Sequence, residues 1–305
     1  MCRVDVYFRA LLSVAASVLM ACPARAQGYV NYDSVGETRL MDDTGNSYGS
    51  GGMQVVSGGY SIPISYQRND RGQVRSWSAN VSASYAKLDN YGEAKALNPD
   101  EVLDAGISLM YLTPISNHWS LMTMVGAGVY APVNDISAES ILGSGGVVFI
   151  RKMSNTINLG VGVGVTNSYG PPMVMPMLYF SWQQSGRFNL KVDMSTGIKV
   201  SASTQLNKWF GLELAAIDMD GMSAVMKVDG KSKIYSMLNM RSYLCPTIRL
   251  DKHLSVYGSV GGNWLRAISI RDRSLKAFFN SLAEENNDPY FRTALRLSIG
   301  TRYRF

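Results

Sequence analysis

Cysteine and histidine are scarce in this chain of 305 residues, which has three of the first and two of the second. Cys2 and Cys22 lie in an N-terminal segment that we expect to be removed, so Cys245 has no partner and no intrachain disulfide is expected. We interpret Cys245 as a small buried or lipid-facing residue. His118 and His253 are far apart in the sequence, which predicts no metal site.

Long apolar runs are also missing after the N-terminal region. No stretch of 18 apolar residues occurs there, which excludes helical membrane spans. Charged residues make up only 17% of the chain. Without residues 1–26 the chain has 26 basic and 22 acidic residues, a net charge of +4 that is too mild to indicate nucleic acid as a partner.

The N-terminal region itself reads as a secretory signal peptide. Arg3 and Arg9 flank a basic start, an apolar run covers residues 10–22, and Ala24-Arg25-Ala26 has the small-x-small pattern of a cleavage site. We expect cleavage after Ala26, which leaves residues 27–305 as one domain. An alternative is a loose lipobox ending at Cys22, in which Cys22 is lipidated; Met20 and Pro23 fit that pattern poorly.

The strongest pattern in the remaining chain is alternation with period two. Residues 157–165, INLGVGVGV, place five aliphatic side chains on one face and Asn158 and three glycines on the other. Runs of about ten alternating residues between turns are typical of transmembrane β-barrels, whereas soluble sandwiches usually have strands of five or six. Strands are predicted at 29–40, 53–67, 74–87, 102–113, 119–130, 141–151, 157–166, 173–183, 187–194, 198–206, 210–219, 234–250, 254–265 and 291–305.

These fourteen strands predict an all-β fold, a single antiparallel up-and-down transmembrane barrel. The first strand has the weakest pattern, and its loss with one other would give twelve. Connections at one end are short, as in the periplasmic turns of bacterial barrels: 68–73, 115–118, 152–156, 184–186, 207–209 and 251–253. Those at the other end are mostly long: 41–52, 88–101, 131–140, 167–172, 220–233 and 266–290, with 195–197 as the exception.

The last predicted strand supports this interpretation. In residues 294–305, ALRLSIGTRYRF, apolar side chains alternate with Arg296, Arg302 and Arg304. A sheet survives in hydrocarbon only when it is closed, so we expect this strand to pair with the first, its apolar face towards lipid and its arginines towards the lumen. Gly300, Tyr303 and Phe305 resemble the C-terminal signal that the outer-membrane assembly machinery reads. Tyr303 and Phe305 would also lie in the periplasmic aromatic girdle.

One internal segment adds a second resemblance. Residues 111–132, with Pro114, Trp119 and the Gly126-x-Gly128 pair, resemble the turn-and-strand pattern of an outer-membrane β-barrel family known only as a domain of unknown function. This resemblance implies a barrel in the outer membrane of a Gram-negative bacterium, in contact with outer-membrane lipid and lipopolysaccharide. It implies no catalytic residue, cofactor or ligand.

Methionine, with 17 residues, marks the expected interior. In 173–182 the lipid face is Val174, Pro176, Leu178, Phe180 and Trp182, and Pro176 indicates a bulge or a break in the ladder. The alternation directs into the lumen a set of apolar and aromatic side chains that we interpret as ligand candidates: Met122, Met124, Tyr130, Met173, Met175, Met177 and Tyr179. Methionine adapts to varied apolar ligands. The competing interpretation is that these residues only fill a narrow barrel.

Three other motifs give weaker indications of a functional site. Gly160, Gly162 and Gly164 belong to an alternating strand and not to a phosphate loop, because no helix follows. Asp218, Asp220 and Asp229 fall in a predicted outer loop that lacks the ligands of a calcium site. Leu275, Phe278, Phe279 and Leu282 have helical spacing, which predicts a short amphipathic helix in 271–290, either over the mouth or packed on the rim.

The residues thus predict no catalytic constellation and no enzyme. His118 and His253 fall in predicted periplasmic turns, so neither could serve a hydrolase that acts at the outer mouth. The sequence favours a passive, porin-like channel for small, moderately hydrophobic molecules. A surface-exposed binding or structural barrel with a closed lumen is the alternative.

Overall fold

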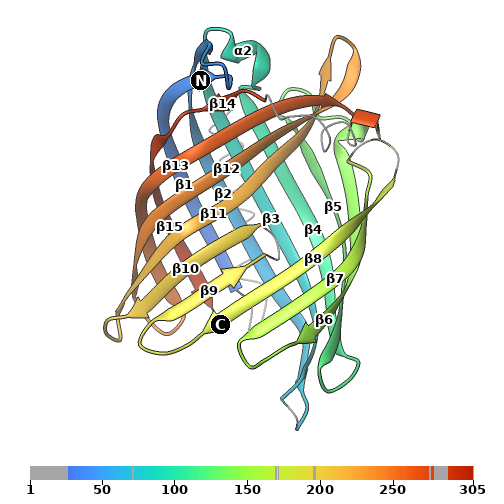
Figure 1. Cartoon of the computed structure of the whole chain (residues 1–305), viewed down its shortest axis with the longest axis vertical. Coiled ribbons are helices and arrows are strands. Elements are labelled where there is room, and N and C mark those ends of the chain that lie inside the picture. Colours follow the sequence, from blue (N-terminus) through green and yellow to red (C-terminus); the bar gives the residue numbers. More distant parts are fainter. Residues whose placement is uncertain are drawn as a thin grey trace.

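The protein is a closed β-barrel (Figure 1). The computed structural model describes residues 27–304, except 71, 169, 171, 195–196, 275 and 278–287. The strands are β1 (Gln27–Met41), β2 (Ser47–Arg68), β3 (Val74–Tyr91), β4 (Glu101–Pro114), β5 (Trp119–Pro132), β6 (Ile141–Lys152), β7 (Ile157–Thr166), β8 (Met173–Gln184), β9 (Asn189–Asp193), β10 (Ile198–Gln205), β11 (Phe210–Val228), β12 (Lys231–Arg249), β13 (Leu254–Asp272), β14 (Tyr290–Phe291) and β15 (Ala294–Arg304).

Each strand pairs antiparallel with its neighbour in sequence, and the last pairs with the first. Gln27 of β1 lies opposite Arg304 of β15, and the register continues to Val35 and Arg296. The two-residue β14 lies between β13 and β1, in line with β15, so the two together form one strand of the wall. The predicted fourteen-stranded up-and-down barrel is therefore confirmed.

Helix is almost absent from the described residues. A single turn, α2 (Ala94–Leu97), follows β3, and a 3-10 turn, η1 (Ala138–Ser140), precedes β6. None of the described helical segments is long and apolar enough to cross a membrane. The signal peptide expected at 1–26 and most of the helix predicted in 271–290 lie outside the described residues, and β13 extends into the latter range as far as Asp272.

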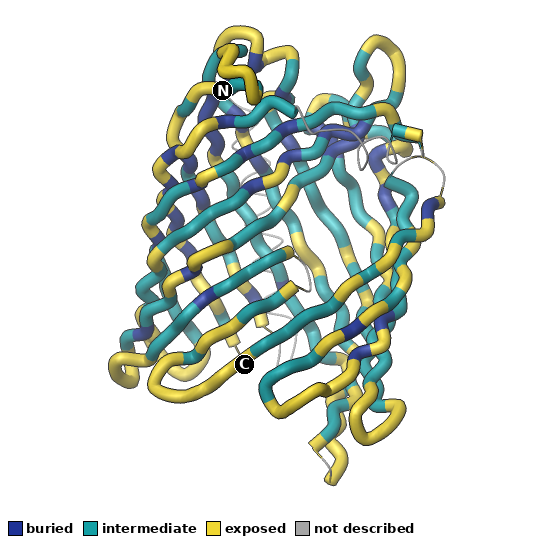
Figure 2. The backbone as a smooth tube through the Cα atoms, in the orientation of Figure 1, coloured by how far each residue is buried: buried dark blue, intermediate teal, exposed yellow. Residues whose placement is uncertain are grey.

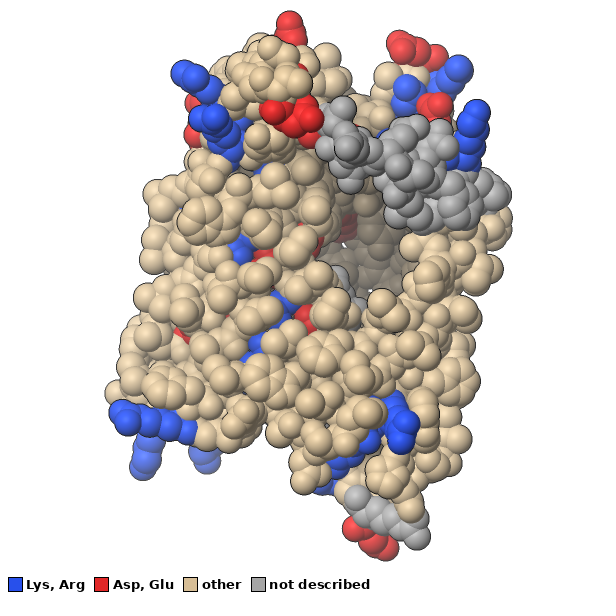
Figure 3. Space-filling view, in the orientation of Figure 1, with Lys and Arg blue, Asp and Glu red and all other residues tan. Residues whose placement is uncertain are grey.

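The outer surface has the apolar alternation that the sequence predicts. On β15, Leu295, Leu297 and Ile299 are 61%, 50% and 59% exposed, whereas Arg296 between them is 6% exposed. On β7, Leu159, Val161, Val163 and Val165 are exposed. Because an up-and-down barrel has one outer and one inner face, these positions fix which residues point inward along each strand. Figure 3 shows that Lys and Arg lie mainly at the two ends of the barrel and leave most of the visible wall free of charge.

The connections separate into two ends as expected. The six at the end near β15's terminus span four or five residues each: 69–73, 115–118, 153–156, 185–188, 206–209 and 250–253. We call this the short-turn end. The opposite end, the hairpin end, holds α2 and the β11–β12 hairpin (Figure 1).

Two predicted loops at the hairpin end are wrong, because strand continues through them. The range 220–233 contains the ends of β11 and β12, joined by the two-residue turn Asp229-Gly230 with φ of +53° and +73°. Polar and glycine residues hid the alternation there. The range 41–52 is also mostly strand, since β2 begins at Ser47. Asp218 and Asp220 therefore belong to β11 and not to a loop.

The hairpin end of the interior is filled by an apolar core. Its buried members come from α2 and from a continuous run of the wall, β11 to β15 followed by β1 to β4. Figure 2 shows buried segments near this end. We call this set the apolar cap: Val35, Leu40, Met53, Ala86, Leu88, Ala94, Val102, Ala224, Tyr235, Met237, Ile268, Phe291 and Ala294. The upper part of β11 also packs against β5 and β4, which closes the cap without β6 to β10.

Two strands are much shorter than the others. β9 has 5 residues and β10 has 8, whereas β11, β12 and β13 have 19 each. The wall between β8 and β11 is consequently low (Figure 1), and the space-filling view is hollowed there, beyond the ends of β9 and β10 (Figure 3).

Candidate functional site in the barrel interior

The interior has two chemically different walls below the apolar cap. One is a belt of charged and polar side chains from β1, β10 to β13 and β15. The other is an apolar wall from β4 to β8. Their contrast follows from the inward residues of each strand, and a solute in the lumen would contact both.

Buried ion pairs hold the charged belt together. Arg296 pairs with Asp33 and donates from Nη1 to Ser259 Oγ at 3.1 Å. Asp33 also accepts from Asn31, whose side-chain oxygen accepts from Ser298 at 3.0 Å. With Arg296 6% and Asp33 7% exposed, neither charge could be buried there alone.

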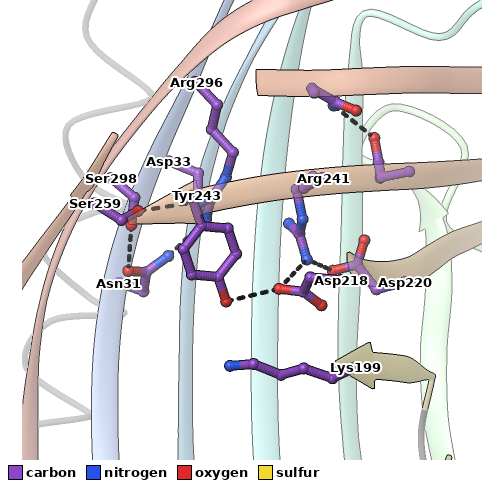
Figure 4. Close-up of polar contacts among 12 residues, drawn as sticks. Asn31, Asp33, Lys199, Asp218, Asp220, Arg241, Tyr243, Ser259, Arg296 and Ser298 are labelled. Atoms are coloured by element: carbon purple, nitrogen blue, oxygen red, sulfur yellow. Dashed lines mark hydrogen bonds and ion pairs between the residues drawn. The ribbon is translucent and has the colours of Figure 1, made fainter. Parts of the chain in front are cut away.

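A second cluster lies beside the first (Figure 4). Arg241 of β12 contacts Asp220 at 2.5 Å and Asp218 at 3.5 Å, and the Tyr243 hydroxyl donates to Asp218 at 2.8 Å. The Arg296 guanidinium lies 4.8 Å from the centre of the Tyr243 ring, which joins the two clusters.

Lys199 of β10 completes the belt. Its Nζ lies 2.6 Å from Glu213 of β11 and 5.6 Å from the Tyr243 ring. Each charge of the belt therefore has an opposite partner. We define the charged belt as Asp33, Lys199, Glu213, Asp218, Asp220, Arg241 and Arg296.

The apolar wall carries the residues that the sequence singles out. Strand register aligns Met110, Met124, Gly146, Gly164 and Met175 in one inward row across β4 to β8. The next row is Leu112, Met122, Val148, Gly162 and Met177. We call the inward side chains of these strands the methionine wall: Met110, Met122, Met124, Tyr130, Met173, Met175, Met177 and Tyr179.

Several of these side chains pack over glycines. A Cβ added to Gly146 or Gly164 would come within 2.5 and 2.9 Å of the Met177 sulfur. The Tyr130 ring covers Gly128 and Gly106 in the same way. Tyr179 lies opposite Gly160, and Met173 is 5% exposed. Part of the methionine wall thus fills space above small residues, and the rest borders the lumen.

Among the cavities bordered by described residues, two lie along the interior. A chamber of about 230 Å³ beneath the apolar cap is bounded by Asp33, Asp104, Arg241 and Arg296 together with cap residues such as Met53. A larger basin of about 890 Å³ opens at the short-turn end. Among the charged residues of its lining, cations outnumber anions: the cations are Lys208, Arg249, Lys252, Arg302 and Arg304, and the anions are Glu213 and Asp251.

Two of the three residues predicted to form a C-terminal assembly signal have a defined place in the wall. Gly300 lies under Tyr257, because an added Cβ would come 2.5 Å from the Tyr257 hydroxyl. Tyr303 pairs with Gly28 of β1 and Leu254 of β13, next to the short-turn end. Phe305 lies outside the described residues.

The two histidines lie in separate turns of the short-turn end, His118 between β4 and β5 and His253 between β12 and β13. His253 lies in the turn before β13, where its Nδ1 is 2.8 Å from the Arg304 carbonyl oxygen. In the same turn the backbone N–H groups of Leu254 and His253 donate to Asp251 and hold its pKa below the usual value. Within the described residues, no group of three or more His, Cys, Asp or Glu could hold a metal.

Most of the charged belt could not be predicted from the sequence. The inward direction of Arg296 was predicted, but Asp33, Lys199 and Arg241 were not recognised as further members of the belt. No sequence signal identifies these residues, because a charged residue on the inward face of a β-strand gives the same pattern whether it is buried and paired or solvated.

A family model described as "Domain of unknown function (DUF6268)" matches residues 22–304. No curated protein matches the chain. Among solved structures, the COG4313 outer membrane channel from Pseudomonas putida F1 is similar with 12% identity and a TM-score of 0.42, over 93% of this chain and 97% of that one.

Two further structures are similar over most of their length. The NanC porin has 7% identity and a TM-score of 0.33, covering 90% of this chain and 100% of that one. The translocator domain of the autotransporter NalP from Neisseria meningitidis has 10% identity and a TM-score of 0.36, covering 99% and 96%. With identities and TM-scores this low, these likenesses carry no argument about function.

Proposed function

Because the chain belongs to a family described only as a domain of unknown function (DUF6268), we propose its role from its geometry: a passive outer-membrane channel for small, moderately hydrophobic molecules. The observation that carries this proposal is the methionine wall. General porins have a polar, water-filled interior, whereas here five strands present methionine, tyrosine and glycine to the lumen. Flexible, polarisable side chains of this kind accommodate apolar solutes of varied shape.

The location follows from the outer surface. Exposed aliphatic residues on β7 and β15 suit contact with hydrocarbon, and the paired inward charges suit a lumen. In this proposal the short-turn end faces the periplasm and the hairpin end faces outward, among lipopolysaccharide. The strand that carries Gly300 and Tyr303 is then the one that the assembly machinery engages.

The basin at the short-turn end supports passage towards the periplasm, because it opens the interior at that end with a volume of about 890 Å³. Paired charges in the belt offer a solute hydrogen bonds without a strong net field. No enzymatic step is needed for this role, and none is proposed.

Entry of an apolar fluorophore tests the proposal. In cells with intact lipopolysaccharide, expression of the protein is expected to speed the entry of 1-N-phenylnaphthylamine, whose emission rises when it reaches phospholipid. Met124→Lys is expected to slow entry about tenfold, the effect of roughly 1.4 kcal/mol added to the barrier by a cation in the apolar wall. Met124→Leu, which keeps the wall apolar, is the matched control.

The alternative role, a surface-binding barrel with a closed lumen, has one observation in its favour. The apolar cap fills the hairpin end between β1 to β4 and β11 to β15. If the fluorophore enters no faster with the protein than without it, and planar bilayers show no conductance, the channel proposal is refuted and the closed barrel is favoured.

A further inference from the structure

The strand β9 is too short to cross a membrane. A transmembrane β-strand needs roughly 9–11 residues, and β9 has 5. At ~3.3 Å per residue and a tilt of about 40°, it covers roughly 13 Å of an apolar band about 25 Å tall. About half of that band beside β9 must therefore be bounded by something other than a continuous sheet.

The neighbouring strand β8 has a free edge at this height. It pairs with β9 only from Ser181 to Gln184, whereas Met173–Tyr179 pair with β7 alone among the described strands. Gln183 donates to Thr156 on the β7 side, and Phe180 accepts from Met194 on the other. Because backbone groups alternate in direction, those of Val174, Pro176 and Leu178 point towards the gap.

Proline at this edge has a physical reason. An unpaired N–H in hydrocarbon costs several kcal/mol, and Pro176 has no N–H. Its register opposite Val163 of β7 is uninterrupted. The break that the sequence predicts at Pro176 is thus a missing neighbour on the β9 side and not a bulge in the β7 ladder.

The other sides of the gap are built from described contacts. β10 pairs with β11 only as far as Ile198 and Met219. Beyond that point β11 remains paired with β12 as far as Val228, parts from β10 and packs on β5, and the Lys227 N–H donates to Asp135 at 2.7 Å. At the hairpin end, Arg273 donates to the Asn167 and Ser168 carbonyls at 3.0 Å, which ties the end of β13 to the segment before β8.

We propose that this gap, the lateral window, is a passage between the lumen and the hydrocarbon of the outer leaflet. The proposal rests on the channel function above and names its route. Figure 3 shows the wall hollowed at this place. The apolar cap blocks the axial way out beneath β1 to β4, while Met175 and Met177 lead from the lumen to the free edge of β8.

The window also selects a class of solute. The methionine wall suits an apolar body, and the backbone groups of Val174, Pro176 and Leu178 that have no strand partner among the described residues suit a hydrogen-bonding head. Every charge of the belt already has an opposite partner, and Asp104, opposite Tyr130 of the methionine wall, has no ion-pair partner among the described residues and would repel an anion. An anionic head would therefore find no counter-charge there, and we expect a small amphiphile with an uncharged head in preference to an anionic one.

Lipid quenching tests the window directly. Single cysteines are introduced in a Cys245→Ser background, labelled with bimane and reconstituted in vesicles of phospholipid brominated on the acyl chains. Met175→Cys lies on the edge strand, and Met110→Cys lies in the same inward row, about 19 Å along the wall at four strand spacings of ~4.8 Å. Val174→Cys, which is 68% exposed on the lipid face, gives the full-quenching reference.

Strong quenching at position 175, close to that at 174, and several-fold weaker quenching at 110 is the expected result. Weak quenching at both inward positions would show a sealed wall and overturn the window. Equal, strong quenching at both would show lipid throughout the interior and also overturn it. Quenching measures lipid contact and not transport, so the two proposals can fail independently. Weak quenching with continued fluorophore entry would overturn the window alone, and strong quenching at 175 without fluorophore entry would overturn the channel alone.

Competition tests the uncharged head. Decanol is expected to relieve the quenching at 175, by displacing lipid chains from the window, more than decyl sulfate does at the same membrane concentration. Equal relief by both, or greater relief by decyl sulfate, would refute the preference for an uncharged head.

Discussion

Replacing Arg266 by methionine is expected to leave the barrel as stable as before or to stabilise it. Arg266 is 2% exposed beside the apolar cap, with its guanidinium carbon 3.7 Å from the centre of the Phe291 ring. Nη2 donates to the Gly51 carbonyl at 2.7 Å, but Nε and Nη1 have no hydrogen-bond partner in the described part of the chain. No carboxylate among those residues pairs with it.

The magnitude follows from what the substitution removes. The lost hydrogen bond from a charged group contributes about 1.5–3 kcal/mol, and the desolvated cation–π contact about 2 kcal/mol. Against this, burying an uncompensated cation costs several kcal/mol, and apolar replacements of buried charges are often neutral or stabilising by ~1–4 kcal/mol. Methionine keeps the unbranched stem, so we expect a change in the free energy of unfolding between zero and roughly +4 kcal/mol.

The same substitution at Arg241 is the matched control with the opposite sign. Arg241→Met leaves Asp218 and Asp220 facing each other without their shared cation. Breaking a buried pair costs about 3–5 kcal/mol, and we expect the lower end because Asp220 has a side chain 46% exposed.

Urea unfolding in detergent micelles, followed by far-ultraviolet circular dichroism and by heat-modified gel mobility, measures both variants. A clear loss of stability in Arg266→Met, similar to that of Arg241→Met, would refute the reasoning. It would mean that the Gly51 and Phe291 contacts outweigh the desolvation of the cation.

Three further predictions concern glycine and the turns. Gly162→Ala is expected to reduce the folding yield strongly, because the added Cβ would come 2.0 Å from a backbone oxygen of β6. In the control Gly164→Ala, the nearest atom to the added Cβ is the movable sulfur of Met177 at 2.9 Å, so this variant should fold. The fraction of heat-modifiable barrel measures the folding yield of both variants. Gly230→Ala should weaken the β11–β12 hairpin by about 1 kcal/mol, because a side chain is unfavourable at the φ of +73° that Gly230 adopts. Amide hydrogen exchange in the hairpin should become faster, and exchange at the wild-type rate would contradict this prediction. The pKa of Asp251 is lower in the folded protein than in the unfolded chain, so ionised Asp251 stabilises the fold above the unfolded pKa of about 3.9. This contribution is lost as the pH falls through the folded pKa. Asp251→Ala should therefore make the free energy of unfolding depend less on pH in the acid range, and an unchanged dependence would contradict the assignment.

The sequence by itself determined the closed barrel, its strand order and its two unlike ends. Alternation such as Leu295, Leu297 and Ile299 against Arg296 is a local property, because successive side chains of a strand point to opposite faces. Lipid on one side and lumen on the other then make that period visible along most of the chain. The inward direction of Met122, Met124, Met175 and Met177 follows from the same rule.

Only the tertiary structure decided how the interior is used. The pairing of Arg296 with Asp33, 263 residues apart, depends on closure between β15 and β1. The apolar cap and the lateral window depend on β11 parting from β10 and packing on β5, which no local period encodes. Pro176 marked the place of the missing neighbour, but whether a strand has one neighbour or two is settled across the barrel, by segments distant in sequence.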